Sequence, residues 1–450
     1  MSHRPSGPTT QSSATQPLAA RPWPASARID VDGLEIGGIS AEELARTFGT
    51  PVMVIDEDDV RARAREFRDA FGTALYAVKA LTARRVIRLV ADEGLGALAA
   101  SGGELRAALE AGVSPERIAL HGNNKSDEEL RMAVAERIGL VIVDNPAELE
   151  RLAPIANDAG ATQPILLRVI PSVTAGGHPS VETGSEDSKF GLTPAEALAS
   201  IHRAAELTGV DPVGLHTHVG SQIEGVAPLL SATDVLVEVA AQASKESGAV
   251  LARFDVGGGF PATYVDEARA NPAAIALEAT NRLRAGLERR GLPPGELIAE
   301  PGRAIVANAG ITLYRVGAVK ERGGRVLAAV DGGMSDNIRP ALYGARHTVA
   351  LASPAPGRPI RTVDVVGKHC ESGDVIARGC ELPEPRPGDL LAVAATGAYC
   401  YSLASNYNQL GRPPLVAVRN GTATPWLRRE TFDDLRSLEV DEADSRLEPG

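Results

Sequence analysis

The fold is decided by residues 139–171, which read GLVIVDNPAELERLAPIANDAGATQPILLRVIP. The stretch opens with one apolar run of strand type, GLVIVDN, and closes with another, PILLRVIP. Between the two runs, Leu149, Leu152 and Ile155 recur at helical spacing. A strand, a helix and a second strand in this order predict two parallel strands joined by a crossover helix.

The same alternation extends on both sides of this stretch. The region holds eight strand-type runs: ALYAVKA (74–80), GALAAS (96–101), RIALHG (117–122), GLVIVDN (139–145), PILLRVIP (164–171), VGLHTHVG (213–220), ARFDVGGG (252–259) and ELIAEPGR (296–303). Eight strand–helix units in about 250 residues predict a closed (β/α)8 barrel of the TIM type over residues 56–308. The pattern by itself also allows an open, doubly wound sheet.

Residues that can carry chemistry fall at or just beyond the ends of all eight runs. They are Lys79, Ser101, His121, Asn145, Arg168, His218, Gly257 to Gly259 and Glu300. A single polar residue at a strand end is usually a turn former, but barrel enzymes build their sites at the carboxyl ends of the strands. Eight such residues in register therefore favour the closed barrel and predict an active site at this rim.

The helical spacing fades after the barrel. The runs GITLYRVGAVKE and GRVLAAVDGG flank Gly323 and Gly324 and predict a β-hairpin, and the pair Asn420-Gly421 predicts another. We therefore expect a second, mostly β domain over residues 309–450, built as a sandwich or a Greek-key barrel.

Two segments precede the barrel. The β-like stretch ARIDVDGLEIGG (27–38) overlaps the start of residues 29–55, and we expect this segment to join the second domain. Residues 1–28 are rich in Ser, Pro, Thr and Ala and lack the continuous apolar stretch of a secretion signal, so we expect a disordered tail. No run approaches about 18 apolar residues without a charge, so no membrane span is predicted.

Composition limits the possible partners. The net charge is -12, whereas a general binder of nucleic acid or of anionic membranes needs a basic face. The three cysteines, Cys370, Cys380 and Cys400, are an odd and small number for a disulfide framework, and their spacing fits no common zinc motif. We expect reduced thiols in a cytoplasmic protein and no bound metal.

Lys79 and three glycine-containing elements suggest a cofactor. Lys79 ends the apolar run YAVKA, where a partly apolar site favours the deprotonated amine that a Schiff base requires. The elements HVGS (218–221), GGG (257–259) and EPGR (300–303) let backbone N–H groups approach an anion closely. Together they predict a phosphorylated cofactor with a carbonyl group, namely pyridoxal phosphate. A sugar phosphate is the alternative ligand, and an ordinary lysine is the simpler interpretation of Lys79 taken alone.

Two further barrel residues fit this cofactor. A carboxylate at Glu300 would favour protonation of the pyridine nitrogen, which makes the cofactor a better electron sink. A salt bridge between Glu300 and Arg303 would also explain the carboxylate. His218 either places its ring against the cofactor or is a core histidine with satisfied hydrogen bonds.

The second domain adds three candidates. The thiol of Cys370, in HCESGD (369–374), can donate a proton to a carbanion, although buried cysteines are more often inert. Arg339 offers a guanidinium suited to bidentate binding of a carboxylate. Tyr399 follows an apolar strand-type run and offers a phenol.

These residues resemble the motif set of the diaminopimelate decarboxylases, in the order of that family. The motifs are FGTPVMVID (48–56), YAVKA (76–80), SGGEL (101–105), HTHVGSQ (216–222), DVGGG (255–259), EPGR (300–303), DGGMSDNIRPALY (331–343), CESGD (370–374) and GAYCYSLASNYN (397–408). The resemblance covers roughly residues 27–440. It implies the alanine-racemase-like fold of pyridoxal-phosphate enzymes, a barrel plus a β domain, in a head-to-tail homodimer.

The resemblance also implies roles in binding the cofactor. Lys79 would form the Schiff base, His218 would stack on the cofactor ring, and Glu300 would pair with the pyridine nitrogen. The resemblance assigns the phosphate to Gly258, Gly259, Gly302 and Arg303, with Tyr399 nearby.

Substrate binding is implied in the same way. The residues that would hold the substrate are Arg303, Arg339, Tyr343 and Tyr399, with Glu371 on the distal amino group. Cys370 would be the proton donor. In this family the segment with Cys370 and Glu371 comes from the partner subunit, which implies a composite active site. TGSEDSKFG (183–191) resembles the family's specificity loop.

The reaction expected from the resemblance is decarboxylation of meso-2,6-diaminopimelate to L-lysine and carbon dioxide, the last step of lysine biosynthesis. The nearest alternatives are decarboxylases of the same fold that act on ornithine, arginine or carboxynorspermidine. The pair Cys370-Glu371 favours a substrate whose far end carries both an amino group and a carboxylate. A racemase of related fold and a non-catalytic cofactor-binding regulator are the remaining alternatives, and the presence of Cys370, Glu371 and Arg339 counts against the regulator.

Overall fold

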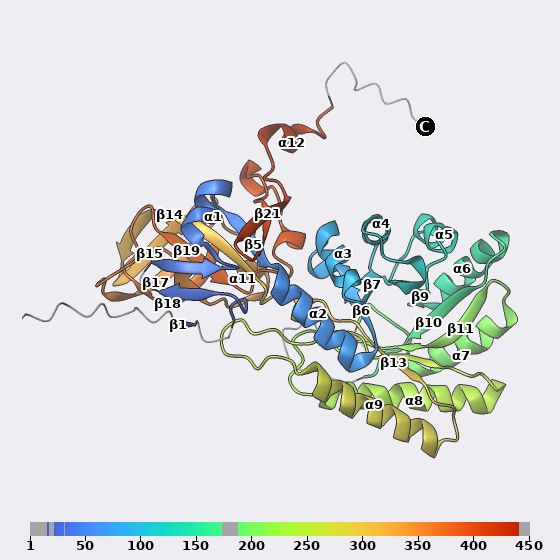
Figure 1. Ribbon diagram of the computed structural model, residues 1–450. Helices are drawn as coiled ribbons and strands as arrows, with labels where there is room; N and C mark the ends of the chain where they lie inside the picture. The colour runs from blue at the N-terminus through green and yellow to red at the C-terminus, as the bar shows by residue number, and fades with distance from the viewer. Residues whose placement is uncertain (1–15, 18–21, 31, 173–187, 441–450) are drawn as a thin grey trace, which may run out of the picture.

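The chain folds into a barrel and a mostly β domain that lie side by side (Figure 1). The computed structural model describes residues 16–17, 22–30, 32–172 and 188–440. The chain passes from the β domain into the barrel between β5 (Val52–Asp56) and α2 (Glu57–Phe71), and it returns at β14 (Gly310–Arg322). Among the described helices, none combines the length and the apolar character needed to cross a membrane.

The barrel is closed by eight parallel strands, as predicted. They are β6 (Thr73–Ala77), β7 (Gly96–Ala99), β8 (Ile118–Leu120), β9 (Leu140–Val143), β10 (Gln163–Arg168), β11 (Val210–His216), β12 (Arg253–Asp255) and β13 (Glu296–Ala299). Each pairs with its neighbours in the chain, and β13 pairs with β6 to close the ring. The pairing of β13 with β6 rules out the open sheet.

Alternate residues of these strands face opposite sides of the barrel wall. Leu75, Leu98 and Ile142 belong to an apolar cluster of strand residues that fills the interior, whereas Tyr76 and Val141 pack among the helices outside. The enclosing helices are α2, α3 (Arg84–Asp92), α4 (Gly102–Glu110), α5 (Asp127–Ala135), α6 (Pro146–Asp158), α7 (Pro194–Glu206), α8 (Ala227–Ser247) and α9 (Pro272–Arg289). Because successive side chains of a strand point to opposite faces, apolar residues fill both faces of the barrel wall. Polar residues lie where the strands end, at the carboxyl rim.

The second domain is built on a branched nine-stranded sheet. Its strands are β5, β14, β15 (Arg325–Val330), β16 (Val349–Leu351), β17 (Ile360–Val366), β18 (Val375–Pro383), β19 (Leu390–Ala394), β20 (Leu415–Arg419) and β21 (Thr422–Leu427). Short helices α10 (Arg303–Val306), α11 (Arg339–Tyr343) and α12 (Phe432–Arg436) complete the described elements after the barrel. Both predicted hairpins are confirmed, since β14 pairs with β15 and β20 pairs with β21, each antiparallel.

A small sheet from the start of the chain covers one face of this domain. It contains β1 (Gln16–Pro17), β2 (Arg28–Asp30), β3 (Gly33–Ile36) and β4 (Ile39–Ser40), and α1 (Ala41–Phe48) follows. Leu34 and Ile36 share an apolar cluster with Val52 and Val54 of β5.

The prediction of a disordered tail over residues 1–28 is wrong for part of that segment. Trp23 is 4% exposed and packs into the same apolar cluster as Leu34. The carbonyl oxygen of Pro22 accepts a hydrogen bond from Asn308 at 2.9 Å. Burial of a large indole stabilises this stretch despite its polar, proline-rich surroundings. Residues 1–15 and 18–21 lie outside the described residues.

Candidate active site

The carboxyl ends of the barrel strands meet at one rim, where the strand-end residues fall into two groups. Ser101 and Asn145 accept hydrogen bonds from the backbone N–H groups of Glu104 and Glu148, at 3.3 and 2.9 Å. They are the N-caps of α4 and α6, so their position is explained by helix initiation. The second group consists of Lys79, His121, Arg168, His218 and Glu300, whose positions helix initiation does not explain.

Lys79 lies in the short 3-10 turn Val78–Ala80 directly after β6. Its side chain is exposed, whereas those of Val78 and Ala80 are buried. Its positive charge acts on the carboxyl of Glu104 and on the imidazole of His218. The amine therefore stands at the barrel mouth within electrostatic reach of both groups, as a lysine that binds a carbonyl cofactor must.

His218 presents a neutral imidazole at the same rim. The backbone N–H of Gly258 donates a hydrogen bond to its Nδ1 at 3.1 Å. Burial, together with the charges of Arg168 and Lys79, holds the pKa of His218 well below its usual value. A neutral aromatic ring fixed in this way is suited to stacking on a flat cofactor ring.

The glycine run after β12 allows three loops to approach one another closely. Gly257 and Gly259 have φ values of +75° and +90°, where L side chains are strained. A Cβ at Gly259 would overlap the carbonyl oxygen of Gly220, and one at Gly258 would press on the carbonyl oxygen of Glu300. Only glycines fit this cradle, and backbone arranged in this manner is typical of phosphate sites.

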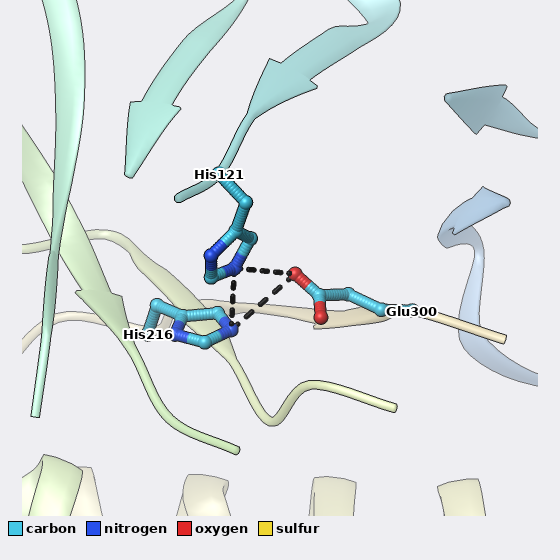
Figure 2. A group of neighbouring side chains, drawn as sticks. All are labelled: His121, His216 and Glu300. Atoms are coloured by element: carbon cyan, nitrogen blue, oxygen red, sulfur yellow. Dashed lines mark hydrogen bonds and ion pairs between the residues drawn. The ribbon is translucent and has the colours of Figure 1, made fainter. Parts of the chain in front are cut away.

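Glu300 follows β13 and is 5% exposed. Its Oε1 lies 3.3 Å from Nε2 of His121 and 3.3 Å from Nε2 of His216, as Figure 2 shows. Burial favours the neutral carboxyl, but the two imidazoles outweigh it and hold the pKa of Glu300 well below its usual value. The carboxylate is therefore ionised, as pairing with a protonated pyridine nitrogen requires.

Two further ionisable side chains surround this carboxylate. Asp255, at the end of β12, is fully buried, and burial together with the charge of Glu300 raises its pKa well above the usual value. Arg168, at the end of β10, is 6% exposed and lies 3.8 Å from Asp144. Its positive charge helps to hold His218 neutral. The interior beneath the rim thus has opposed charges on Glu300 and Arg168, with Asp255 protonated.

Arg303 begins α10, directly after Gly302. Its Nη1 donates to the hydroxyl of Tyr264 at 2.6 Å, and its Nη2 donates to the hydroxyl of Ser221 at 2.8 Å. Its guanidinium carbon also lies 4.7 Å from the ring centre of Tyr399. These contacts fix the guanidinium beside the glycine cradle.

Arg339 brings a second guanidinium from the β domain to Tyr264. It is 6% exposed, and its guanidinium carbon lies 4.3 Å from the centre of the Tyr264 ring. Its Nη1 is 3.5 Å from Nε2 of His347, whose Nδ1 lies 2.9 Å from the carbonyl oxygen of Ala394. That carbonyl places the imidazole proton on Nδ1 and leaves Nε2 to accept from Arg339. Two guanidinium groups on one tyrosine suit a carboxylate-bearing ligand.

Tyr343 and Tyr399 lie on the same side of the β domain. Tyr343 ends α11, four residues after Arg339, and is half-buried. Tyr399 is half-buried as well and contacts Arg303. Arg303 and Arg339 therefore meet at Tyr264, and Tyr399 adjoins them through its contact with Arg303.

Cys370 and Glu371 are exposed on the β domain. The backbone N–H of Cys370 donates to Oδ1 of Asn408 at 3.1 Å, and Nδ1 of His369 lies 3.1 Å from the same oxygen. Among the described residues, no hydrogen bond or ion pair joins Cys370 or Glu371 to Lys79. In the described part of one chain, Cys370 is thus linked to Asn408 and not to the lysine. The other two cysteines are free as well, and burial raises the pKa of Cys400 to about 12, which leaves an inert thiol.

The segment that resembles a specificity loop, 183–191, lies largely outside the described residues. Of its last residues, Phe190 lies 4.4 Å beneath the guanidinium carbon of Arg168. The N–H of Gly191 donates to Oδ2 of Asp144 at 3.0 Å. The described end of this segment is thus attached to the barrel rim beside β9 and β10.

The residues present fit pyridoxal phosphate better than a sugar phosphate. Both ligands would use the glycine cradle, where neighbouring backbone atoms occupy the space that a side chain would need. A sugar phosphate does not require an exposed amine at a strand end, and it has no ring nitrogen that an ionised carboxylate could pair with. Lys79 matches the aldehyde, Glu300 matches the ring nitrogen, and His218 matches the ring face.

Comparison with known proteins agrees with this assignment. A family profile described as "Pyridoxal-dependent decarboxylase, pyridoxal binding domain" matches residues 57–307, so fold and site define a pyridoxal-dependent decarboxylase. The chain is 46% identical over 440 residues to the diaminopimelate decarboxylase of Mycobacterium tuberculosis, covering 94% of this chain and 98% of the relative. It is 41% identical over 417 residues to that of Bacillus subtilis, covering 90% and 95%. The chain belongs to the diaminopimelate decarboxylase family.

Solved structures show the same relationship. The diaminopimelate decarboxylase of M. jannaschii, in co-complex with L-lysine, superposes with a TM-score of 0.87 at 32% identity, covering 93% of this chain and 98% of that one. A lysine/ornithine decarboxylase from Vibrio vulnificus, complexed with putrescine, gives 0.72 at 27% identity, covering 84% and 97%.

Sequence reasoning missed several residues of the site. Tyr264 and His347 lie in loops without a recognisable motif, so nothing in their spacing pointed to the site. His216 carried a usable signal, since it precedes His218 by two residues and so lies on the same side of its strand. His121 was noted only as a strand-end residue, and its approach to Glu300 depends on the curvature of the closed barrel.

Proposed function

We propose that the protein decarboxylates meso-2,6-diaminopimelate to L-lysine and carbon dioxide, the last step of lysine biosynthesis. One observation carries the proposal: the exposed amine of Lys79 and the ionised carboxylate of Glu300 stand at one barrel rim, in the positions that a pyridoxal cofactor needs. Family membership over nearly the whole chain supports the choice of substrate.

The chain supplies the surroundings of the reacting group. Pyridoxal phosphate, when bound, supplies a ring that accepts the electrons left by departing carbon dioxide. Lys79 would bind the cofactor aldehyde and would be free to exchange with a substrate amine. Glu300 would keep a proton at the ring nitrogen, and His218 would support the ring from one face. The Gly258–Gly259 backbone and Arg303 would hold the phosphate.

The residues on the side of the β domain are assigned to orienting the substrate. Arg303, Arg339, Tyr343 and Tyr399 offer donors for carboxylate groups on the side of the β domain. Diaminopimelate has two amino acid ends, so the end that is held at a distance from Lys79 determines which carboxylate is lost. The distal amino group is assigned to a carboxylate, Glu371.

The assembly is a homodimer with composite sites. In one chain Cys370 is exposed and has no hydrogen bond with Lys79 among the described residues, and this supports delivery of the thiol from a second copy. In that arrangement the partner subunit's Cys370 returns a proton to the alpha carbon, and the partner subunit's Glu371 binds the distal amino group. The enzyme is assigned to the cytoplasm.

The second candidate function is decarboxylation of ornithine or lysine. Only the similarity to the Vibrio vulnificus enzyme favours this function, and that similarity is lower than the similarity to the diaminopimelate decarboxylases. The test is to offer meso-diaminopimelate, ornithine, arginine and lysine to the holoenzyme side by side and to measure carbon dioxide. Rapid release from diaminopimelate alone is expected, with L-lysine as product. Release from ornithine, arginine or lysine without any from diaminopimelate would overturn the proposal.

A further inference from the structure

Two imidazoles approach one oxygen atom of the Glu300 carboxylate. His121 follows β8 and is 9% exposed, and His216 ends β11 and is fully buried. Their Nε2 atoms are 3.1 Å apart, and each lies 3.3 Å from Oε1 of Glu300. Figure 2 shows both ring edges turned toward the carboxylate. Three strands of the barrel thus place these groups together, although nothing in the mechanism above uses the two histidines.

The positions of the protons follow from burial and geometry. Burial lowers the pKa of His121 to about 3, and burial lowers the pKa of His216 as well. Both rings are therefore neutral, with one proton each. A neutral ring stabilises an ionised oxygen only through an N–H, because an unprotonated nitrogen would turn its lone pair toward the carboxylate.

His216 supplies an independent indication of where its proton lies. Its Nδ1 is buried and has no hydrogen-bond partner in the described part of the chain. A buried N–H without an acceptor is more costly than a buried lone pair without a donor. The proton therefore belongs on Nε2, which faces Glu300. The two Nε2 atoms are also within hydrogen-bond distance of each other, and a bond between them would require one to be unprotonated. Oε1 of Glu300, however, is buried and has no hydrogen-bond partner in the described part of the chain apart from what these two rings can offer. A proton on Nε2 of His121 would stabilise that oxygen, whereas a lone pair there would be turned toward it.

We infer that His121 is a positioning residue for Glu300: together with His216 it donates N–H groups to Oε1, so that the second oxygen faces the pyridine nitrogen. Donors to the ionised form make a carboxylate less basic. The proton shared with the cofactor then stays on the ring nitrogen, where it favours electron withdrawal. This inference rests on the proposed use of pyridoxal phosphate.

A metal ion is the competing explanation of the same three atoms. Two histidines and a glutamate are a common ligand set for zinc, and separations of 3.1 to 3.3 Å suit tetrahedral ligation. Histidine ligands of metals, however, normally donate their other N–H to an acceptor. Nδ1 of His216 has no such acceptor among the described residues. The missing acceptor for Nδ1 of His216 therefore favours direct contact between the imidazoles and the carboxylate over a shared metal ion.

The test compares His121→Asn with His121→Gln in the holoenzyme. The Gln amide extends about as far as Nε2 and keeps a donor near Glu300, whereas the shorter Asn amide does not reach it. The cofactor is labelled at its ring nitrogen, and NMR reports the protonation of that atom. We expect a protonated nitrogen in the wild type and in His121→Gln. In His121→Asn we expect a shift toward the unprotonated form, weaker cofactor binding, and kcat about 10- to 100-fold lower.

Controls separate this inference from the proposed function. His202→Gln changes a half-exposed histidine on α7 and should leave all readouts unchanged. Glu300→Gln should remove the proton from the ring nitrogen. If it does not, the pairing of Glu300 with the cofactor fails. If Glu300→Gln has this effect and His121→Asn does not, only the His121 inference is overturned.

Two further measurements keep the test decisive. Metal analysis of the purified holoenzyme should find no stoichiometric zinc, and one zinc per chain that is lost in His121→Asn would overturn the inference. If His121→Asn does not fold, NMR of wild-type enzyme labelled at its histidine nitrogens replaces it. Protons on Nε2 of both His121 and His216 are expected, and an unprotonated Nε2 on His121 would contradict the proposal.

Discussion

The backbone N–H of Tyr399 donates a hydrogen bond to the carbonyl oxygen of Ala80, with a length of 2.8 Å. Ala80 directly follows Lys79, and Tyr399 belongs to the β domain, so this bond attaches the second domain to the turn that carries Lys79. Tyr399 has a φ of +62°, which is unusual for a residue with a side chain and is characteristic of functional sites. The β domain thus reaches the turn that holds Lys79.

Gly397 is predicted to be essential for this contact. A Cβ at this position would overlap the carbonyl oxygen of Val306 in α10, so Gly397→Ala should push the Tyr399 loop away from Lys79. We expect cofactor affinity to fall about 10-fold and the free energy of unfolding to fall by about 1–3 kcal/mol. Spectral titration with pyridoxal phosphate and urea unfolding measure the two effects. Gly317→Ala is the matched control, because its added Cβ meets no atom closer than 3.8 Å. Equal behaviour of the two variants would contradict the prediction.

Mixing two inactive variants tests the composite site. Lys79→Ala and Cys370→Ala should each have little activity alone. If each site combines Lys79 of one chain with the partner subunit's Cys370, half of the sites in a mixed dimer are intact. Random reassociation should then restore about a quarter of the wild-type activity. The comparison is carbon dioxide release before and after the variants are unfolded and refolded together. No recovery, with mixed dimers demonstrated by differently tagged chains, would place both groups in one chain.

Lys125 and Glu148 form a buried ion pair behind the rim. Their charged atoms are 2.7 Å apart, and the two side chains are 1% and 0% exposed. Lys125→Met should lower the free energy of unfolding by about 3–5 kcal/mol, because it leaves a buried carboxylate without its partner. The double variant Lys125→Met with Glu148→Leu should recover most of this loss. Urea unfolding measures both.

An exposed pair provides the control for this ion pair. Arg203 and Glu150 lie 2.6 Å apart with side chains 45% and 48% exposed, so Arg203→Ala should produce no measurable change. A loss in Lys125→Met no larger than in Arg203→Ala would show that the buried pair is unimportant for stability.

Much of the site could be predicted from strand periodicity, and the rest could not for a physical reason. Lys79, His218 and Glu300 follow apolar strands, and parallel strands of a closed barrel bring their carboxyl ends to one rim. The pattern of the chain therefore determines that these three residues meet. Tyr264 and His347 lie in loops, whose paths depend on contacts between the two domains.

The limits of composition are visible at the start of the chain. Residues rich in Ser, Pro and Ala suggested a free tail, yet Trp23 is buried against the β domain. A single large aromatic side chain can stabilise a short segment that otherwise has the composition of a disordered one. Window averages over such segments conceal that contribution.

Asp336 should make stability depend on pH. It is 3% exposed, and burial, together with the charges of Asp374 and Asp331, raises its pKa to about 7 despite a hydrogen bond from Tyr314. A carboxyl whose pKa is raised on folding stabilises the protein fully below its ordinary value of 3.8, and this stabilisation is lost as the pH rises through about 7.

Comparison with Asp336→Asn isolates that group. Between about pH 4 and pH 7 the free energy of unfolding of the wild type should fall relative to that of the variant, by an amount on the order of a few kcal/mol. Urea unfolding across this range provides the measurement. Parallel pH profiles for the two proteins would show that Asp336 titrates normally in the fold.

The most direct test of the account is to locate the cofactor on the chain. The chain has six lysines: Lys79, Lys125, Lys189, Lys245, Lys320 and Lys368. Borohydride reduction of the holoenzyme, followed by digestion and peptide mass spectrometry, identifies the lysine that carries the pyridoxyl group. The account predicts stoichiometric modification of Lys79 alone and loss of the visible absorbance band in Lys79→Ala. Modification of another lysine, with Lys79 untouched, would contradict it.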